Sequence, residues 1–181
     1  MSIKITYFVH GTTTDNEKKI SSGWNDVELS ELGKGQATDL KKLVRDRTFN
    51  VVFCSDLKRA HDSAKLVFED GAPIIRDARL RESNYGKYNG ESSDVVEPML
   101  GEFISDRFPE GESLEDVKAR IADFLEYLKE NHDSKNVAIV AHKAPQLALD
   151  VLLKGETWEG AFAKDWRKTK QWRPGWEYVV S

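Results

Sequence analysis

Three short apolar segments of the chain have the pattern of buried β-strands. They cover residues 3–9, 51–54 and 137–141, and they are rich in β-branched and aromatic side chains. Each segment runs directly into polar residues. These residues are His10 after the first segment, Ser55 with Asp56 after the second, and His142 after the third. The pattern therefore predicts three strands that deliver polar side chains at their carboxyl ends.

Apolar residues at helical spacing predict helices between and after these strands. The first helix covers about residues 30–45, with Ser30 as its expected N-cap, and a second follows the middle strand. The clearest helix covers residues 113–131, where Ser113 gives a cap signal. Pro145 fits the first turn of a fourth helix. The apolar positions of the first three helices are Leu32, Leu40, Leu43 and Val44; Leu57, Ala60, Ala64 and Val67; and Leu114, Val117, Ile121, Phe124, Leu125 and Leu128.

The alternation of strands and helices predicts an α/β fold, a three-layer α/β/α sandwich around a mostly parallel sheet. The 181 residues fit one domain with a single core. Sites in such sheets lie at the carboxyl ends of the strands, so we expect His10 and His142 to lie close together. The segment 84–98, rich in Gly, Ser and Asn, predicts a long loop that serves as a lid or substrate-side element.

Composition narrows the class of protein. Hydrophobic residues make up 39% of the chain and the net charge is −4, which fits a soluble globular protein and argues against nucleic-acid binding. Neither a signal peptide nor a membrane span is recognisable, so we expect a cytoplasmic protein. The single cysteine, Cys54, fits a reducing compartment. Arg59 follows it by five positions rather than the six of cysteine phosphatases, so Cys54 is interpreted as a buried core thiol.

His10 is the first candidate for chemistry. Gly11 follows at once, as expected where backbone must approach a ligand closely. Two imidazoles, those of His10 and His142, beside Arg59 would suit an anion, and a neutral histidine can attack phosphorus. Hydroxyl and amide donors follow in the same stretch. They are Thr12, Thr13, Thr14 and Asn16.

Six motifs in order, over residues 3 to about 150, resemble those of the histidine phosphatase superfamily, which has the phosphoglycerate-mutase-like fold. Any one of them alone would be weak, but six in sequence are strong evidence. The motifs are Val9 to Asn16; Gly23 to Gly33; Ser55 to Ala60; Leu80-Arg81-Glu82 with Gly86 and Gly90; Pro109 to Leu114; and Val140-Ala141-His142.

The resemblance implies a role for each matching position. His10 would be the nucleophile that becomes phosphohistidine, and His142 and Arg59 would bind the phosphoryl oxygens. Glu82 would protonate the leaving alkoxide and later deprotonate water; outside the motif it would be read as a solvated carboxylate. The implied substrate is a small-molecule phosphate ester, with neither a metal nor another cofactor required. The implied substrate-binding positions are Gly11, Thr13, Asn16, Ser22 and Gly23.

Two positions depart from the family pattern. Val9 stands where the family has an arginine that binds the transferred phosphoryl group. The loss of such a charge-assisted contact costs roughly 1.5–3 kcal/mol in binding. Lys143 stands where the family has a small residue, so we also count it as a substrate-binding candidate. One hypothesis is that Lys143 reaches into the pocket and partly restores the charge; the other is that it points to solvent.

The C-terminal segment, residues 155–181, diverges from the family. Its tryptophans alternate with cations, a pattern that fits either single-stranded nucleic acid or a sugar, or else packing on the core. We favour packing, with an amphipathic helix followed by an edge strand at residues 176–180. The segment could also form an extra wall of the substrate pocket. The tryptophans concerned are Trp158, Trp166, Trp172 and Trp176.

The sequence thus favours hydrolysis of a small phosphomonoester through phosphohistidine on His10. A phosphoglycerate-type mutase is an alternative, because Asn84-Tyr85-Gly86 resembles the mutase form of that loop, although the chain is short for that branch. A catalytically weak phosphate-ester-binding protein is a third alternative, motivated by Val9. The substrate and the oligomeric state stay open.

Overall fold

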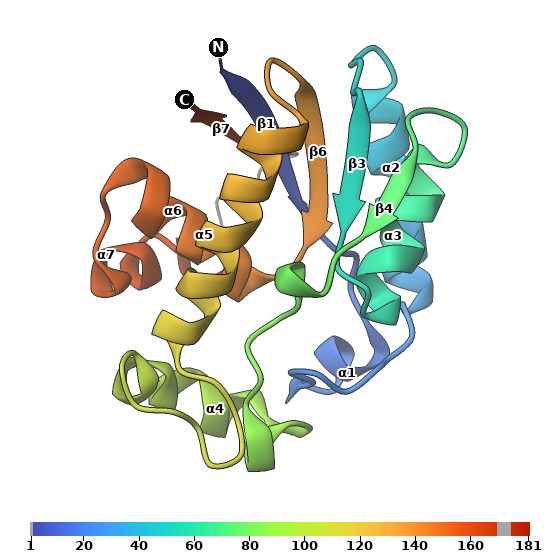
Figure 1. Ribbon diagram of the computed structural model, residues 1–181. Coiled ribbons are helices and arrows are strands. Elements are labelled where there is room, and N and C mark those ends of the chain that lie inside the picture. The colour runs from blue at the N-terminus through green and yellow to red at the C-terminus, as the bar shows by residue number, and fades with distance from the viewer. Residues whose placement is uncertain (1, 170–174) are drawn as a thin grey trace.

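A five-stranded sheet forms the centre of the computed structural model, which describes residues 2–169 and 175–181. The strand order is β4-β3-β6-β1-β7 (Figure 1). Four strands are parallel, and β7 runs antiparallel to β1 at one edge. The predicted strands and the mostly parallel sheet are confirmed. The strands are β1 (Ile3–Val9), β3 (Val51–Cys54), β4 (Ile74–Arg76), β6 (Asn136–Ala141) and β7 (Trp176–Val180).

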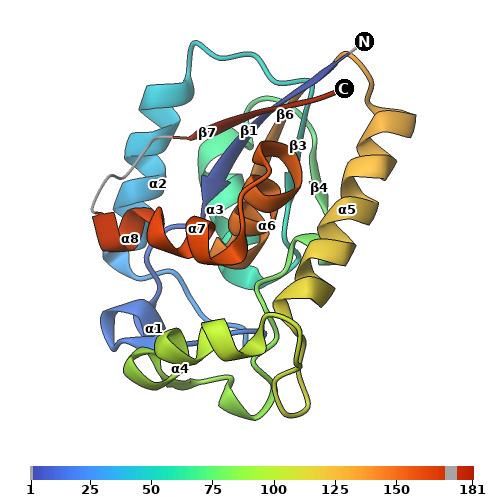
Figure 2. The ribbon, with the colours of Figure 1, turned by 90° about the vertical axis from the view of Figure 1, so that its left-hand side faces the viewer.

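Helices cover both faces of the sheet, as the three-layer prediction requires (Figure 1, Figure 2). Alternate β1 side chains face opposite layers, so Tyr7 packs in one core cluster and Phe8 in the other. One layer holds α2 (Glu31–Val44) and α3 (Lys58–Phe68). The other layer holds α5 (Leu114–Asn131), α6 (Lys143–Lys154) and α7 (Trp158–Ala163).

The predicted helix starts are confirmed. The Ser30 hydroxyl accepts a hydrogen bond from the Gly33 backbone at 3.2 Å. Ser113 and Asp116 form a reciprocal capping box at the start of α5, and Pro145 lies in the first turn of α6. α2 and α5 therefore begin where the side chain of the N-cap satisfies a backbone N–H group that lacks a partner within the helix.

The apolar face predicted for α2 is wrong in part. Leu32 and Leu43 are 57% and 60% exposed. Val44 is buried and Leu40 is partly buried, as predicted, whereas Gly33 and Ala37 are buried in place of the two exposed leucines. Small residues at that spacing let α2 approach its neighbours closely, which leaves the two leucines at the flank of the contact.

The segment 84–98 is not the long loop that the sequence predicted, although Tyr85, Ser93 and Glu97 do line the cavity described below. The segment holds a 3₁₀ turn and then β5 (Glu91–Ser92), which pairs with β2 (Ile20–Ser21). It continues into α4 (Ser93–Met99), whose N-cap is Ser92. A small apolar cluster of its own supports this region, which explains why it is ordered. The fully buried members of that cluster are Tyr85, Val96, Leu100 and Phe108.

Short helices and an edge strand make up the C-terminal segment. The expected strand is β7, and α7 is followed by α8 (Trp166–Thr169) in place of one longer helix. Trp158 and Trp176 are buried in the main core, so the packing interpretation is confirmed for them, whereas Trp172 lies outside the described residues. Within the described ranges, no helix is both long and apolar enough to cross a bilayer. Cys54 is fully buried, and burial raises its pKa to about 12.

Candidate active site

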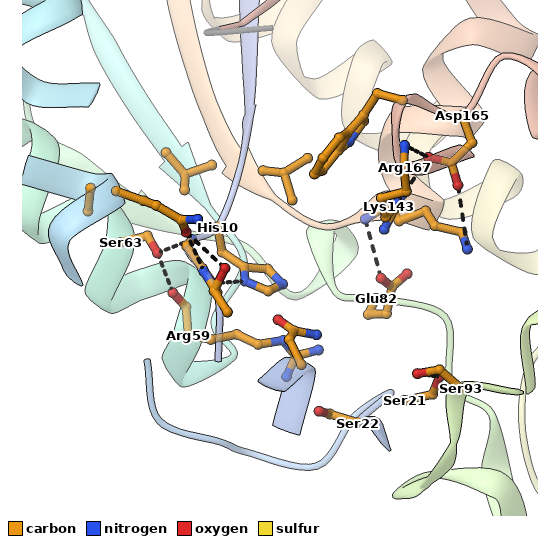
Figure 3. Close-up of a pocket in the computed structure, with 18 of the residues that line it drawn as sticks. His10, Ser21, Ser22, Arg59, Ser63, Glu82, Ser93, Lys143, Asp165 and Arg167 are labelled. Atoms are coloured by element: carbon orange, nitrogen blue, oxygen red, sulfur yellow. Dashed lines mark hydrogen bonds and ion pairs between the residues drawn. The ribbon is translucent and has the colours of Figure 1, made fainter. Parts of the chain in front are cut away.

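A cavity of about 990 Å³ lies at the carboxyl ends of β1 and β6. Its walls come from the loop after β1, from α2 and α3, from α4, and from the segment around α8. Figure 3 shows His10 and Arg59 on one side of this space and Glu82 on the other. Five of the six motif segments, distant in the sequence, therefore meet at one edge of the sheet, as the strand-end rule predicts.

The rings of His10 and His142 lie together, with centroids 5.0 Å apart. This confirms the predicted proximity of the two histidines. Nδ1 of His10 lies 2.7 Å from the carbonyl oxygen of Gly11. Because a carbonyl can only accept, Nδ1 must carry the hydrogen, and Nε2 keeps its lone pair in the neutral ring. The hydrogen bond therefore selects the tautomer whose Nε2 can act as a nucleophile.

The surroundings of His10 keep its imidazole uncharged. Burial against the protein lowers its pKa to about 3, and the nearby cation of Arg59 acts in the same direction. A neutral ring is the reactive form, because protonation would occupy the lone pair of Nε2. Near neutral pH the nucleophile therefore needs no separate base to activate it.

The position of His142 is set by Tyr7 in the neighbouring strand. The Tyr7 hydroxyl donates to the His142 carbonyl at 2.6 Å and accepts from its backbone N–H at 3.0 Å. The His142 side chain is fully buried, and neither ring nitrogen has a hydrogen-bond partner among the described residues. Burial lowers its pKa well below the usual value, as do the charge of Arg59 and the nearby His10. Because its ring nitrogens have no hydrogen-bond partner in the part of the chain that is described and the ring lies beside His10, His142 is suited to donate a hydrogen bond to a ligand bound there.

The backbone around Gly11 is packed too tightly for a side chain. A Cβ at Gly11 would lie 2.5 Å from the Gly33 carbonyl oxygen, and one at Gly33 would lie 2.0 Å from that of Thr12. The Gly11 N–H donates to the Ser63 hydroxyl at 3.0 Å. Two glycines thus allow the loop after β1 to lie against the first turn of α2, which fixes the backbone next to His10.

Arg59 projects from the first turn of α3 and is buried. Its guanidinium donates to the carbonyl oxygens of Gly23 at 2.7 Å and Asn25 at 3.0 Å. Burial lowers its pKa, yet an arginine remains charged at any pH of interest. The two carbonyls hold a permanent cation beside His10, where an anionic group would be attracted.

Glu82 is held at the start of α6. Its Oε1 accepts from the backbone N–H groups of Ser83 at 2.9 Å and Ala144 at 3.0 Å. Its Oε2 accepts from that of Lys143 at 3.2 Å. The carboxyl group is almost fully buried and lines the cavity. It is therefore positioned across from His10, with Oε2 less fully engaged than Oε1 by the described residues.

The family of the chain follows from its likeness to known proteins. The profile of the histidine phosphatase superfamily (branch 1) matches residues 7–174. The chain belongs to the histidine phosphatase superfamily. A relative of this superfamily member is the 2,3-bisphosphoglycerate-dependent phosphoglycerate mutase of Methylorubrum populi, which is 30% identical over 164 residues. That alignment covers 82% of this chain and 77% of the relative.

Solved structures with the same fold include two proteins named as phosphatases. The alpha-ribazole phosphatase from Shigella flexneri is 26% identical, with a TM-score of 0.77 over 90% of this chain and 84% of that chain. A mycobacterial glucosyl-3-phosphoglycerate phosphatase solved with VO3 is 28% identical, with a TM-score of 0.74 over 90% of this chain and 86% of that chain. The phosphoglycerate-mutase-like fold of this histidine phosphatase superfamily member is therefore established.

The structure places some of the predicted substrate-binding positions at the cavity and one of them away from it. Asn16, Ser22 and Gly23 line the cavity together with Gly11. Thr13 is fully buried instead, and its hydroxyl accepts from the Asn16 backbone as the N-cap of α1 (Thr14–Glu17). Its side chain therefore supports the loop and does not line the cavity.

The structure contradicts the hypothesis that Lys143 points to solvent and agrees with the other one only in part, because Lys143 lines the cavity but its charge is already paired. The side chain is 4% exposed, so it does not point to solvent. Its ammonium pairs with Glu97, and the carboxylate of Asp165 lies 3.8 Å away. A buried ammonium requires such compensation. Its charge is thus neutralised within the cavity wall.

Sequence reasoning assigned no role at the site to four residues near it. Ser63 lies one helical turn after Arg59, and this spacing could have indicated it. Tyr7 lies within the predicted strand 3–9, whose pattern does not indicate its hydrogen bonds to His142. Trp166 and Arg167 line the cavity from the C-terminal segment, as the extra-wall interpretation allowed without naming a contact. In the part of the chain that is described, no group of three or more His, Cys, Asp or Glu side chains could hold a metal ion.

The depressed pKa of His10 predicts an unusual titration. Its ring should stay neutral as the pH falls from about 8 to about 5, so the proton NMR shift of its C2–H should remain flat. In urea the same ring should titrate near its ordinary value of about 6.5. Because the unfolded state alone takes up this proton, the free energy of unfolding should fall as the pH drops from about 6.5 towards 3. A folded-state midpoint near the ordinary value would contradict the arrangement.

Proposed function

We propose that the protein hydrolyses a small-molecule phosphomonoester through a phosphohistidine intermediate on His10. The observation that carries this proposal is the hydrogen bond from His10 Nδ1 to Gly11, which leaves Nε2 with its lone pair in a ring kept neutral. The cation of Arg59 lines the cavity beside His10, and the ring of His142, whose nitrogen atoms have no hydrogen-bond partner among the described residues, lies against that of His10. Together these groups supply a nucleophile, His10, and a cation and a ring N–H that can bind the phosphoryl group.

In the first step, Nε2 of His10 bonds to phosphorus while the bond from phosphorus to the ester oxygen breaks. The alkoxide that leaves takes a proton from a protonated Glu82. In the second step, water attacks phosphorus and the bond to Nε2 breaks. Glu82 accepts the proton from that water, which restores both residues and releases inorganic phosphate.

Positive charge and hydrogen-bond donors around the phosphoryl oxygens lower the barrier of both steps. Arg59 supplies the charge and is held in place before the substrate arrives. A neutral His142 offers one ring N–H, and its backbone is fixed by Tyr7. Asn16 and Ser22 lie on the substrate side of the same space.

The size and lining of the cavity bear on the alcohol part of the ester. The volume of about 990 Å³ exceeds what a phosphate group needs. Leu40 and Leu43 of α2 and Val67 of α3 contribute apolar surface to it. An ester with an apolar body would bury this surface, so a substrate panel should hold aryl esters as well as three-carbon and sugar phosphates.

A mutase is the second candidate, favoured by the likeness to the Methylorubrum populi enzyme. The first step would be the same. The phosphoryl group on His10 would then pass to a hydroxyl of an organic acceptor in place of water. The two functions differ only in which oxygen attacks the intermediate.

The test combines labelling with product analysis. We expect phosphate release from at least one ester of the panel, together with acid-labile, base-stable phosphate on the quenched protein. With 3-phosphoglycerate and a bisphosphate primer, isomerisation without phosphate release would favour the mutase. Neither turnover nor labelling with any ester, in protein that still binds phosphate, would favour the weak-binding alternative.

A further inference from the structure

The superfamily member lacks the cation expected at position 9, so the question is which residue supplies it. Among the described residues, four cations line the cavity: Arg59, Lys143, Arg167 and Lys168. Arg59 already belongs to the motif pattern, and Lys143 is neutralised by Glu97 and Asp165. The ammonium of Lys168 lies 5.9 Å from the centre of the ring of Phe162, a residue that does not line this cavity, so the ammonium points towards the edge of the cavity.

Arg167 is the remaining cation, and it is held in a defined position. Its backbone N–H and its Nε both donate to Oδ1 of Asp165 at 3.0 Å. Asp165 is almost fully buried, so it is a fixed anchor. The two terminal nitrogen atoms of the guanidinium make no hydrogen bond to another described residue. The side chain is thus oriented at Nε, with its terminal donors available at the cavity.

Val9 and the Arg167 segment lie on the same face of the sheet. Val9 and Trp166 both pack against the core cluster on the α5–α6 side, and both line the cavity. Figure 3 shows Arg167 entering the cavity from the side opposite His10 and Arg59. A long side chain at position 9 would extend into the same space. The short side chain of Val9 leaves that space open.

The electrostatics of His10 agree with this placement. The charge of Arg167 contributes to the lowered pKa of His10, after burial and the charge of Arg59. Burial raises the pKa of Tyr85, which also lines the cavity, and the charge of Arg167 partly opposes that rise. Its guanidinium therefore acts on the region where a phosphoryl group would bind.

We infer that Arg167 supplies the phosphoryl-binding cation that Val9 does not, so that the C-terminal segment completes the anion site. This assignment rests on the proposed function, in which a phosphoryl group lies on His10. Its terminal N–H groups would contact phosphoryl oxygens from the side opposite Arg59. A guanidinium suits that role because its planar donors match two oxygens at once.

The decisive measurement is the affinity for inorganic phosphate, by calorimetry, which requires no turnover. Arg167→Gln should weaken binding about ten- to a hundredfold, the loss expected for one charge-assisted contact. Arg167→Lys should lose less, because it keeps the charge. Arg47→Gln is the matched control, since Arg47 pairs with Glu177 at the surface and does not line the cavity. Thermal unfolding of each variant checks that the fold is retained.

A second pair of variants tests whether an arginine at position 9 would occupy the same part of the cavity as Arg167. Val9→Arg alone should not improve phosphate affinity, because two guanidinium groups would compete for one space. Val9→Arg combined with Arg167→Gln should restore most of the lost affinity, since contacting sites couple rather than add. If Val9→Arg raises the phosphate affinity by the same factor whether or not Arg167 is present, the two side chains occupy different parts of the cavity. That result would overturn the inference.

The outcomes separate this inference from the proposed function. Wild-type phosphate affinity in folded Arg167→Gln would overturn the inference, even if esters are hydrolysed through His10. If no ester is hydrolysed but phosphate binding still depends on Arg167, the proposed function fails and the assignment of the cation stands.

Discussion

Replacement of His10 by alanine is expected to abolish phosphate release and protein labelling while leaving the fold intact. The loss should be at least about a thousandfold, as for other covalent nucleophiles. His142 should not take over, because its ring is fully buried beside that of His10, where we expect it to donate an N–H to the phosphoryl group rather than to attack phosphorus. Initial rates on the best ester of the panel, with labelling after acid and base treatment, measure the effect.

The control for His10→Ala is His61→Ala. His61 lies on α3 and does not line the cavity, so the variant removes an imidazole elsewhere. It should retain nearly the full rate. Turnover of folded His10→Ala close to that of the unchanged protein would refute the phosphohistidine mechanism, whatever the substrate.

Arg59→Gln should show the second largest effect. The variant removes the buried cation beside His10, and the expected loss in kcat is about a hundred- to a thousandfold. It also removes the guanidinium that donates to Gly23 and Asn25. The unfolding temperature should therefore fall as well, because two carbonyl groups lose their donors.

Two further variants separate the effect of Arg59→Gln on the rate from its effect on stability. Lys58→Gln removes a cation from the adjacent position of α3, where the side chain is half-exposed and pairs with Asp62 and Glu28. It should change the rate little. Arg59→Lys keeps the charge without the planar fork, and we expect an intermediate rate. If Arg59→Gln is stable and hydrolyses ester at an unchanged rate, Arg59 serves only to hold the loop.

The parts of the fold that the sequence predicted well depend on local patterns. The helix 114–131 carries its cap and its apolar stripe within one segment, and β6 is a continuous apolar run. The meeting of His10 and His142 followed from a general rule about strand ends. In each case, neighbouring residues or simple topology contain the information.

The features that the sequence did not predict depend on contacts between distant segments. β2 and β5 have two residues each, which is too short for an alternating apolar pattern, so the sequence could not predict that they pair. The ammonium of Lys143 is matched by carboxylates from two other segments, at Glu97 and Asp165. No rule of spacing connects those three positions. The same holds for Arg167, whose approach to the cavity is fixed by a turn anchored at Asp165.

The position of β1 within the sheet has a consequence for how the protein is made. Both of its neighbours, β6 and β7, come from the last third of the chain. On the ribosome, the strand that leads to His10 has neither partner until residues 136–180 have emerged. Contacts between such distant segments form slowly, because a long loop must close first. The strand that leads to His10 is therefore made long before the two strands that flank it in the sheet.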